Sequence, residues 1–323
     1  MNSLRIIYMG TPDFAVEPLR TLFEAGCNIV ACVTMPDKPV GRHHDVLQQS
    51  PVKQFALSHD IPVLQPERLR DEEFLRQLRA FEADLQVVVA FRMLPEVVWA
   101  MPRLGTFNLH AALLPQYRGA APINWAIING DTQTGVTTFF LDHDIDTGQV
   151  IYREAVPILP DDDAEAVHDR LMHLGSQLVL RTVRDVASGS VRPIPQSELV
   201  VDGPLRPAPK IFRETCQLHW AELTAQQAYN FVRGLSPYPA AWTTLQGQQL
   251  KVFRSAVVES DATFPITLPA DAVPGALVVA EGLFLVRCRQ GWLSLLEVQL
   301  AGKRRMPVQD FLRGAHIEAD CVI

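Results

Sequence analysis

An amide and an imidazole lie two residues apart in the segment from Thr106 to Leu114. In an extended strand, side chains two positions apart project from the same face, so Asn108 and His110 are expected to be neighbours. An amide donor beside an imidazole is suited to stabilising a developing oxyanion and moving a proton. An Asn-x-His pair is more commonly part of a hydrogen-bonded framework, so catalysis is here a hypothesis that needs a third group.

A polar, acidic turn is predicted at residues 141–148, with three alternate aspartates at Asp142, Asp144 and Asp146. The glycine and distal glutamate of a calcium loop are not in place, which disfavours metal binding. The commonest role of such residues is to cap backbone amides in a solvated turn. The alternative is that Asp146 lies beside His110, orients its ring and favours its charged form.

Two further segments contain chemically informative residues. Gly10-Thr11 follows the first apolar stretch, but the G-x-G-x-x-G spacing of a dinucleotide site is absent. The segment 36–53 is long for a connection in a compact domain, and Lys38, Arg42 and Lys53 on it are suited to contacting phosphates. An ordinary exposed loop is the plainer interpretation. His43-His44 has no third ligand at a recognisable spacing, so no metal is predicted.

Strands and helices alternate in the first part of the chain, which favours a doubly wound α/β sheet. Ligands of such sheets bind outside the carboxyl ends of the strands, where residues 108–110 are expected. The predicted helices are a segment with Pro18 in its first turn and residues 51–59, 71–83 and 163–186. The predicted strands are residues 4–9, 28–34, 85–91, 106–110, 136–141 and 150–156.

A proline-rich stretch without periodicity separates this part from the rest, and it reads as an extended linker. After it, one helix is predicted at residues 224–234, followed by short strands and turns that are typical of a small β-barrel. The predicted domains are therefore a catalytic domain at 1–188, a linker at 189–209 and a C-terminal domain at 210–323.

The bulk composition is that of a soluble globular protein, with 48% hydrophobic and 20% charged residues. A net charge of −7 does not attract nucleic acid in general, so an anionic polymer would need local basic patches. The five cysteines are scattered and favour free thiols in a reducing compartment. With neither a signal peptide nor an apolar stretch long enough to span a bilayer, a cytoplasmic protein with no membrane association is expected.

Seven segments resemble the methionyl-tRNA formyltransferase family, in the family's order and at roughly its spacing. In the first part these are GTPDF at 10–14, PDKPVGR at 36–42 with SPVK at 50–53, NLHAALLPQYRGAAPI at 108–123 and DIDTG at 144–148. In the second part they are APKI at 208–211, RGLSPYPAAW at 233–242 and AGKRRM at 301–306. The resemblance covers nearly the whole chain.

The resemblance implies a Rossmann-like catalytic domain, an OB-like C-terminal barrel, 10-formyltetrahydrofolate as formyl donor and the amino group of initiator methionyl-tRNA as acceptor. It implies a monomer that uses no metal. The implied catalytic residues are Asn108, His110 and Asp146. The implied folate-binding loop is Ala112, Leu113, Leu114 and Pro115, and the implied tRNA contacts are Lys38, Arg42, Lys53, Lys303, Arg304 and Arg305.

The chain departs from the family pattern in two places. The family usually has serine where this chain has Ala112, so a side-chain contact to folate is lost while backbone contacts can remain. Family members often continue past Arg42 with glycine and lysines, whereas this chain has His43-His44-Asp45. Fewer fixed charges there imply weaker and more pH-sensitive attraction of phosphates.

The catalytic residues alone do not identify the acceptor, because formyltransferases acting on nucleotide sugars or purine precursors share them. Segment 36–53 and the C-terminal part favour tRNA. A nicotinamide dehydrogenase would need the missing glycine fingerprint. A non-catalytic RNA-binding protein fits the barrel but leaves Asn108, His110 and Asp146 without a role.

Overall fold

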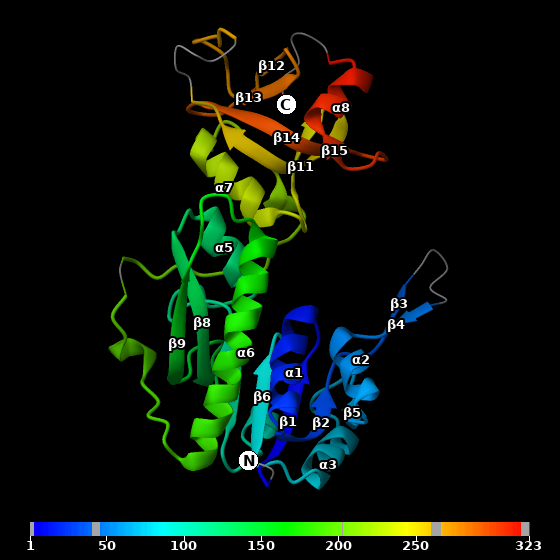
Figure 1. Ribbon diagram of the computed structural model, residues 1–323, viewed down its shortest axis with the longest axis vertical. Coiled ribbons are helices and arrows are strands. Elements are labelled where there is room, and N and C mark those ends of the chain that lie inside the picture. The colour runs from blue at the N-terminus through cyan, green and yellow to red at the C-terminus, as the bar shows by residue number, and fades with distance from the viewer. Residues whose placement is uncertain (1–2, 41–45, 202, 260–265, 318–322) are drawn as a thin grey trace. The chain divides into compact units, whose positions relative to one another are not determined.

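The computed structural model describes residues 3–40, 46–201, 203–259, 266–317 and 323 (Figure 1). The chain forms two compact units. The first comprises Met1–Pro122, Thr134–Pro157 and His168–Ala208, and the second comprises Ile123–Gln133, Ile158–Val167 and Pro209–Ile323. The last boundary between the units falls between Ala208 and Pro209, and no sequence pattern predicts that segments 123–133 and 158–167 belong to the second unit.

A seven-stranded sheet in the order β5-β2-β1-β6-β7-β8-β9 forms the centre of the first unit. The pairs β1–β2, β2–β5, β1–β6 and β6–β7 are parallel, and β8 runs antiparallel to β7. The strands are β1 (Arg5–Gly10), β2 (Asn28–Val33), β5 (Val63–Leu64), β6 (Leu85–Val89), β7 (Thr106–His110), β8 (Gln133–Phe140) and β9 (Val150–Pro157). The predicted α/β class is confirmed, with an antiparallel edge.

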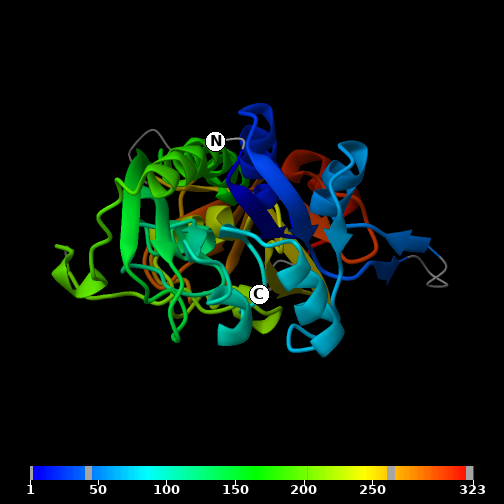
Figure 2. The same cartoon turned by 90° about the horizontal axis from the view of Figure 1, so that it is seen from below.

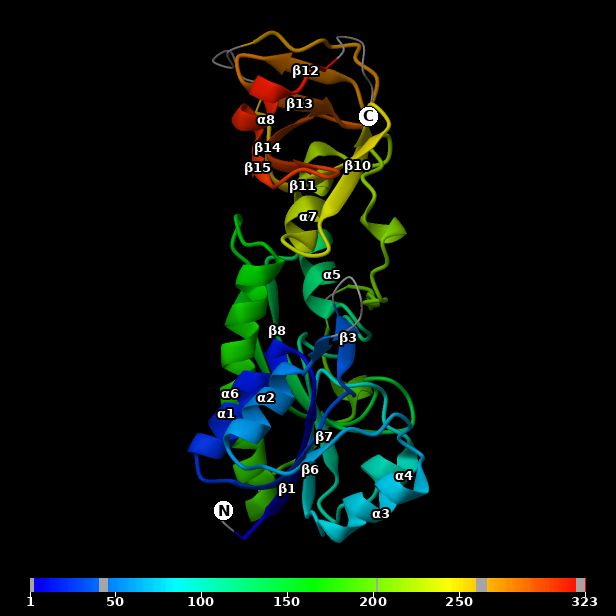
Figure 3. The ribbon, with the colours of Figure 1, turned by 90° about the vertical axis from the view of Figure 1, so that its right-hand side faces the viewer.

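Helices cover both faces of this sheet, as Figure 3 shows. On one face lie α1 (Val16–Glu24), α2 (Pro51–Ser58) and α6 (Ala164–Ser188), and on the other lie α3 (Glu72–Ala80) and α4 (Glu96–Trp99). The same layers are visible from below in Figure 2. The apolar side of α3 packs against β1, β2 and β6, while its N-terminus is capped by the Asp71 carboxylate. The long helices were predicted; the short α4 was not.

Gly10 ends β1 at a point where the backbone allows no side chain. A Cβ atom there would lie 2.7 Å from the Ala15 Cβ and 3.0 Å from the Val89 carbonyl oxygen. The glycine turn of the sequence therefore serves close packing between β1, β6 and the short helix η1 (Asp13–Ala15).

We expect Gly10→Ala to lower the free energy of unfolding by about 1–3 kcal/mol, because strand and helix must separate to admit the methyl group. Denaturant unfolding measures this. Gly314→Ala, at a position with nothing within 4 Å of the new Cβ, is the control and should not destabilise. Equal stability of Gly10→Ala and the parent would contradict the packing argument.

An antiparallel sheet in the order β10-β11-β14-β13-β12 forms the second unit, with β15 paired to β14. This agrees with the predicted OB-like class. The strands are β10 (Ala241–Leu245), β11 (Gln248–Val257), β12 (Leu277–Ala280), β13 (Leu283–Arg287), β14 (Trp292–Leu300) and β15 (Met306–Pro307). The helices are α5 (Pro122–Ile128), the 3-10 turn η3 (Glu214–Cys216), α7 (Ala225–Leu235) and α8 (Val308–Gly314).

Helix α7 begins at a capping box in which Thr224 and Gln227 satisfy each other's backbone amides. It buries Ala228, Val232 and Leu235 in the core of the second unit. Its start and its apolar face agree with the helix predicted at residues 224–234.

The described residues of the proline-rich stretch up to Ala208 belong to the first unit, where they pair with other parts of the chain. Ile194 pairs with Val150 at the start of β9, and Ala208 pairs with Gly119. Between them the 3-10 turn η2 (Gln196–Glu198) buries the Gln196 side chain. A second element without a sequence prediction is the hairpin of β3 (Lys38–Val40) and β4 (Val46–Gln48) inside segment 36–53.

The described cysteines, Cys27, Cys32, Cys216 and Cys288, are free and buried, and burial raises the pKa of the Cys32 thiol to about 12. Among the helices that the structure describes, none has the length and apolar character needed to cross a membrane.

Candidate active site

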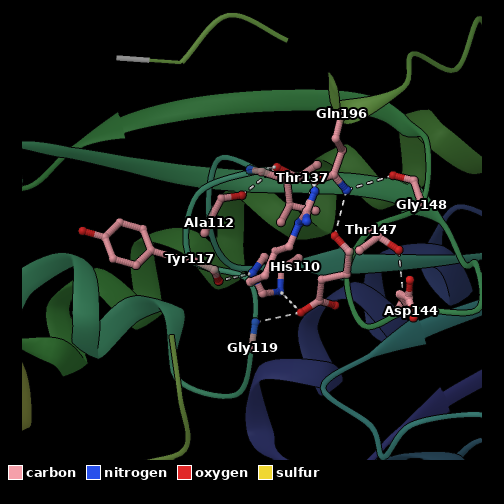
Figure 4. Close-up of polar contacts among 12 residues, drawn as sticks. His110, Ala112, Tyr117, Gly119, Thr137, Asp144, Thr147, Gly148 and Gln196 are labelled. Atoms are coloured by element: carbon pink, nitrogen blue, oxygen red, sulfur yellow. Dashed lines mark hydrogen bonds and ion pairs between the residues drawn. The ribbon is translucent and has the colours of Figure 1, made fainter. Parts of the chain in front are cut away.

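Strand β7 carries Asn108 and His110 on one face (Figure 4 shows the contacts of His110). The His110 side chain is 6% exposed. Its Nε2 atom lies 2.8 Å from the Tyr117 carbonyl oxygen, and its Nδ1 atom lies 3.8 Å from Oδ2 of Asp146. The structure therefore brings together the histidine and the aspartate that the sequence proposed as partners.

Asp146 has a backbone conformation that few residues adopt, with φ of 55°. Aspartate tolerates this left-handed region better than most residues, yet holding it there still costs on the order of 1 kcal/mol. Its Oδ2 atom accepts a hydrogen bond from the Gly119 amide at 2.9 Å. The carboxylate is thus fixed from one side by a backbone donor while it faces the imidazole.

The route by which Asp146 reaches His110 was not foreseen. Strand β8 is antiparallel to β7 and ends at Phe140, opposite Phe107, whereas His110 lies opposite Thr137. The acidic turn therefore leaves the sheet near the start of β7, and the loop returns to bring Asp146 to the ring. The expectation that functional residues follow the carboxyl ends of parallel strands therefore holds for His110. It does not hold for Asp146, which follows the antiparallel strand β8.

Both ring nitrogens of His110 face acceptors, so only the protonated ring can donate from each of them. The distance from Nδ1 to Asp146 exceeds that of a direct hydrogen bond, and the Nδ1 hydrogen remains available to a third atom. The Asn108 carboxamide is half-buried and makes no hydrogen bond with any residue in the described part of the chain. One face of β7 therefore carries the Asn108 carboxamide and the His110 ring, whose Nδ1 atom lies 3.8 Å from the Asp146 carboxylate.

Three consecutive loop residues hold the surroundings of this site together. The Tyr117 carbonyl binds His110, the Gly119 amide binds Asp146, and the Arg118 guanidinium donates to Oε1 of Gln196 at 2.6 and 3.1 Å. The amide of Gln196 in turn binds the loop of Asp146. Sequence reasoning singled out neither Arg118 nor Gln196, because a lone glutamine in a proline-rich stretch has no signal of its own.

The segment proposed to hold folate, Ala112 to Pro115, is fixed through its backbone. The Thr137 hydroxyl donates to the Ala112 carbonyl at 2.6 Å and accepts from the Leu114 amide at 3.1 Å. Ala112, Leu114 and Pro115 are buried and Leu113 is half-buried, so the segment's shape is set by β8. The methyl group of Ala112 is fully buried. A ligand beside this segment would meet backbone more than side chain.

The base of segment 36–53 is anchored. Lys53 forms an ion pair with Asp37 at 2.6 Å, and the Gln65 amide donates to the same carboxyl group at 2.7 Å. Together these donors lower the pKa of Asp37. Lys38 is exposed on β3 and available to phosphates, whereas Lys53 is largely buried against Asp37. Arg42 and the variant His43-His44-Asp45 lie outside the described residues.

The three basic residues at 303–305 in the second unit also differ in whether they form an ion pair. Lys303 and Arg304 are exposed in the turn between β14 and β15. Arg305 donates two hydrogen bonds to the Glu297 carboxylate and lies over the Phe253 ring at 4.3 Å from its centroid. Its guanidinium therefore has a structural role on the sheet. In the described residues, no three histidine, cysteine or acidic side chains are grouped as a metal ion would require.

Known proteins resemble this chain over nearly its whole length. The family model Formyl transferase matches residues 4–183, and Formyl transferase, C-terminal domain matches residues 210–316. Methionyl-tRNA formyltransferase of Bacteroides fragilis is 56% identical over 98% of this chain and 96% of its own. The Flavobacterium johnsoniae enzyme of the same name is 44% identical over 97% of both chains.

Solved structures support the fold. A sugar 3N-formyl transferase has a TM-score of 0.63 at 16% identity and covers 93% of this chain and 99% of its own. HypX from Aquifex aeolicus, in complex with tetrahydrofolic acid, has a TM-score of 0.63 at 16% identity over 98% of this chain and 48% of its own. Identity near or above half of all residues over nearly the full length is far more specific than these likenesses. The chain belongs to the methionyl-tRNA formyltransferase family.

Proposed function

We propose that this protein transfers a formyl group from 10-formyltetrahydrofolate to the α-amino group of methionyl initiator tRNA. The single observation that carries the substrate assignment is 56% identity, over 98% of the chain, to relatives named for this reaction. The chemistry is supported by the site itself. A carboxamide without a partner among the described residues and a histidine beside a carboxylate can stabilise the oxyanion that forms in acyl transfer.

In the proposed reaction the neutral amine attacks the formyl carbon, and the carbonyl oxygen becomes negative in a tetrahedral intermediate. The Asn108 carboxamide and the Nδ1–H of protonated His110 donate hydrogen bonds to this oxygen. They lower the barrier because they bind the developing charge more strongly than the neutral carbonyl. Nδ1 is the donor because Nε2 is held by the Tyr117 carbonyl at 2.8 Å.

Asp146 stabilises the charged ring and accepts the proton that the attacking amine loses, directly or through water. Collapse of the intermediate breaks the bond between the formyl carbon and N10 of the folate, and N10 takes up that proton. The products are formylmethionyl-tRNA and tetrahydrofolate. No metal takes part in these steps. We propose the segment Ala112 to Pro115 as the folate contact, through its backbone.

We propose Lys38, Arg42, Lys53, Lys303, Arg304 and Arg305 as contacts of the tRNA backbone, but not as equals. The exposure of Lys38, Lys303 and Arg304 supports a direct role for them. The ion pairs of Lys53 and Arg305 support a role in shaping the surface that carries the free charges. The enzyme is proposed to work in the cytoplasm, where charged tRNA is found. It is also proposed to be a monomer, and light scattering of the purified protein tests its oligomeric state.

We expect Lys303→Ala and Arg304→Ala each to weaken tRNA binding and to reduce the slope of log affinity against log salt by about 1. Each removes one exposed positive charge whose side chain has no ion-pair partner among the described residues. Arg305→Ala should instead lower the melting temperature, since it breaks the pair with Glu297. Filter binding over a range of salt concentrations measures the slopes; unchanged slopes in both variants would remove this turn from the tRNA interface.

The proposed function is tested by incubating the protein with 10-formyltetrahydrofolate and charged initiator tRNA and measuring formylmethionine. A parallel reaction supplies an amino sugar nucleotide as acceptor. Formylation of the tRNA alone supports the proposal. Formylation of the sugar nucleotide without formylation of the tRNA would overturn the acceptor assignment and leave the transfer chemistry intact.

A further inference from the structure

Gln196 is a buried polar residue that the reaction outlined above does not use. It lies on η2 within the proline-rich stretch 189–209, and only 5% of it is exposed. A buried carboxamide is costly unless its donors and acceptor are all satisfied. Here they are satisfied by two other parts of the first unit, the Arg118 side chain and the turn of Asp146 and Gly148; Figure 4 shows the bond of Gln196 with Gly148.

The orientation of the carboxamide is determined by its partners. Arg118 donates to one end from Nε at 3.1 Å and from an Nη atom at 2.6 Å, so that end must be the oxygen. The other end is therefore the amino group. It donates to the Asp146 carbonyl at 2.8 Å and to the Gly148 carbonyl at 2.9 Å. One side chain thus fixes two carbonyl groups of a single turn.

These bonds act where the backbone is under constraint. Asp146 has a left-handed φ of 55°, and its carbonyl is one of the two that Gln196 holds. Gly148 packs against the Phe140 carbonyl so closely that a Cβ would lie 1.7 Å from its oxygen. If the Asp146 backbone relaxes, its carboxylate turns away from Nδ1 of His110, because the side chain is short.

We infer that Gln196 is a positioning residue for the catalytic carboxylate: it holds Asp146 in the conformation that faces His110, and Arg118 fixes it in that role. The inference rests on the proposed function. It also assigns the stretch 189–209 a part in the active site besides connecting two domains. The Tyr117 carbonyl binds the His110 ring, and the Gly119 amide binds the Asp146 carboxylate. Arg118, which lies between them in the sequence, binds Gln196, and Gln196 binds the turn of Asp146.

The test variant is Gln196→Glu, which keeps an acceptor for Arg118 but replaces the amino donor with an oxygen that repels both carbonyls. We expect kcat to fall roughly 10–100-fold, since a small displacement of a catalytic group has an effect of this size. The KM for 10-formyltetrahydrofolate should stay within about threefold of the parent value, because the folate loop is held separately by Thr137. Gln196→Met, of similar volume, should behave alike if the glutamate variant folds poorly.

The matched control is Gln116→Glu. Gln116 also ties the proline-rich stretch to the same loop, since its amide donates to the Pro204 carbonyl at 3.1 Å and its oxygen accepts from the Arg206 amide at 2.8 Å. It does not touch the turn of Asp146. We expect its kcat to change less than about threefold. Equal losses in both variants would mean that docking of the stretch matters in general, and would overturn the inference.

A double-mutant cycle with Asp146→Asn separates positioning from structure. If Gln196 acts through the carboxylate, Gln196→Glu should change kcat by less than about threefold in the Asp146→Asn background. Additive losses would overturn the inference.

Hydrogen exchange gives a readout independent of activity: amides of residues 142–148 should exchange faster in Gln196→Glu than in the parent or Gln116→Glu. If the parent forms no formylmethionine, the proposed function fails, and exchange still reports whether Gln196 holds the turn.

Discussion

Replacing Asn108 with alanine is expected to lower kcat by roughly 100–1,000-fold, the cost of losing one oxyanion donor, or about 2.7–4 kcal/mol of barrier. In the proposed mechanism the carboxamide acts in the transition state, and it should contribute little to the fold because it has no hydrogen-bond partner among the described residues. The melting temperature should therefore stay within a few degrees of the parent. Steady-state formylation of charged initiator tRNA measures the effect.

Two variants make this result specific. Asn108→Asp keeps the shape of the side chain but removes the amide donor, so its loss should match that of alanine. Thr106→Val lies two residues earlier on the same face of β7 and removes the hydroxyl that donates to the Trp99 carbonyl. It should lower stability with little change in kcat. Near-normal turnover in Asn108→Ala would exclude this residue from the mechanism.

Neutralising Asp146 is expected to have an effect at least as large. Asparagine tolerates the left-handed backbone and keeps an oxygen for the Gly119 amide, so Asp146→Asn removes the charge and leaves the geometry. We expect kcat to fall by roughly 100–10,000-fold, the range for loss of a group that moves or stabilises a proton. Single-turnover measurements separate this loss in chemistry from changes in substrate binding.

Asp144→Asn is the matched control, since it changes the charge of the same turn by the same amount. The Asp144 side chain is exposed and forms no ion pair within the described part of the chain, while its backbone carbonyl accepts a hydrogen bond from the Thr147 hydroxyl. Its kcat should stay near the parent value. A similar loss in both variants would point to the charge of the whole turn, and not to the contact of Asp146 with His110.

The periodicity of apolar residues was sufficient to predict most of the fold. The continuous apolar run of β6 and the capping residues of α3 and α7 involve neighbouring residues in the sequence. Such local patterns form the same elements in the folded structure. The pairing of Asn108 with His110 is equally local, because side chains alternate along every strand. The family motifs extended these predictions to the folate loop and the acceptor.

Apart from the contact of Asp146 with His110, contacts between distant segments could not be predicted in this way. The antiparallel direction of β8 decides from which side Asp146 approaches His110, and no residue in β8 predicts that direction. Gln196 lies 50 residues from Asp146 along the chain, and its partners are backbone carbonyls that carry no sequence signature. Lys53 and Arg305 look like free charges in the sequence, but the fold supplies them with carboxylate partners.

The difference has one physical cause. Residue types and their spacing specify which groups can donate, accept or carry charge, and so they identify the amide, imidazole and carboxylate of this protein. Whether each of those groups finds a hydrogen-bond partner depends on which backbone atoms folding places beside it. That is why residues 108–110 could be proposed as a site from the sequence, and why the glutamine that binds the turn of Asp146 became visible only in the folded structure.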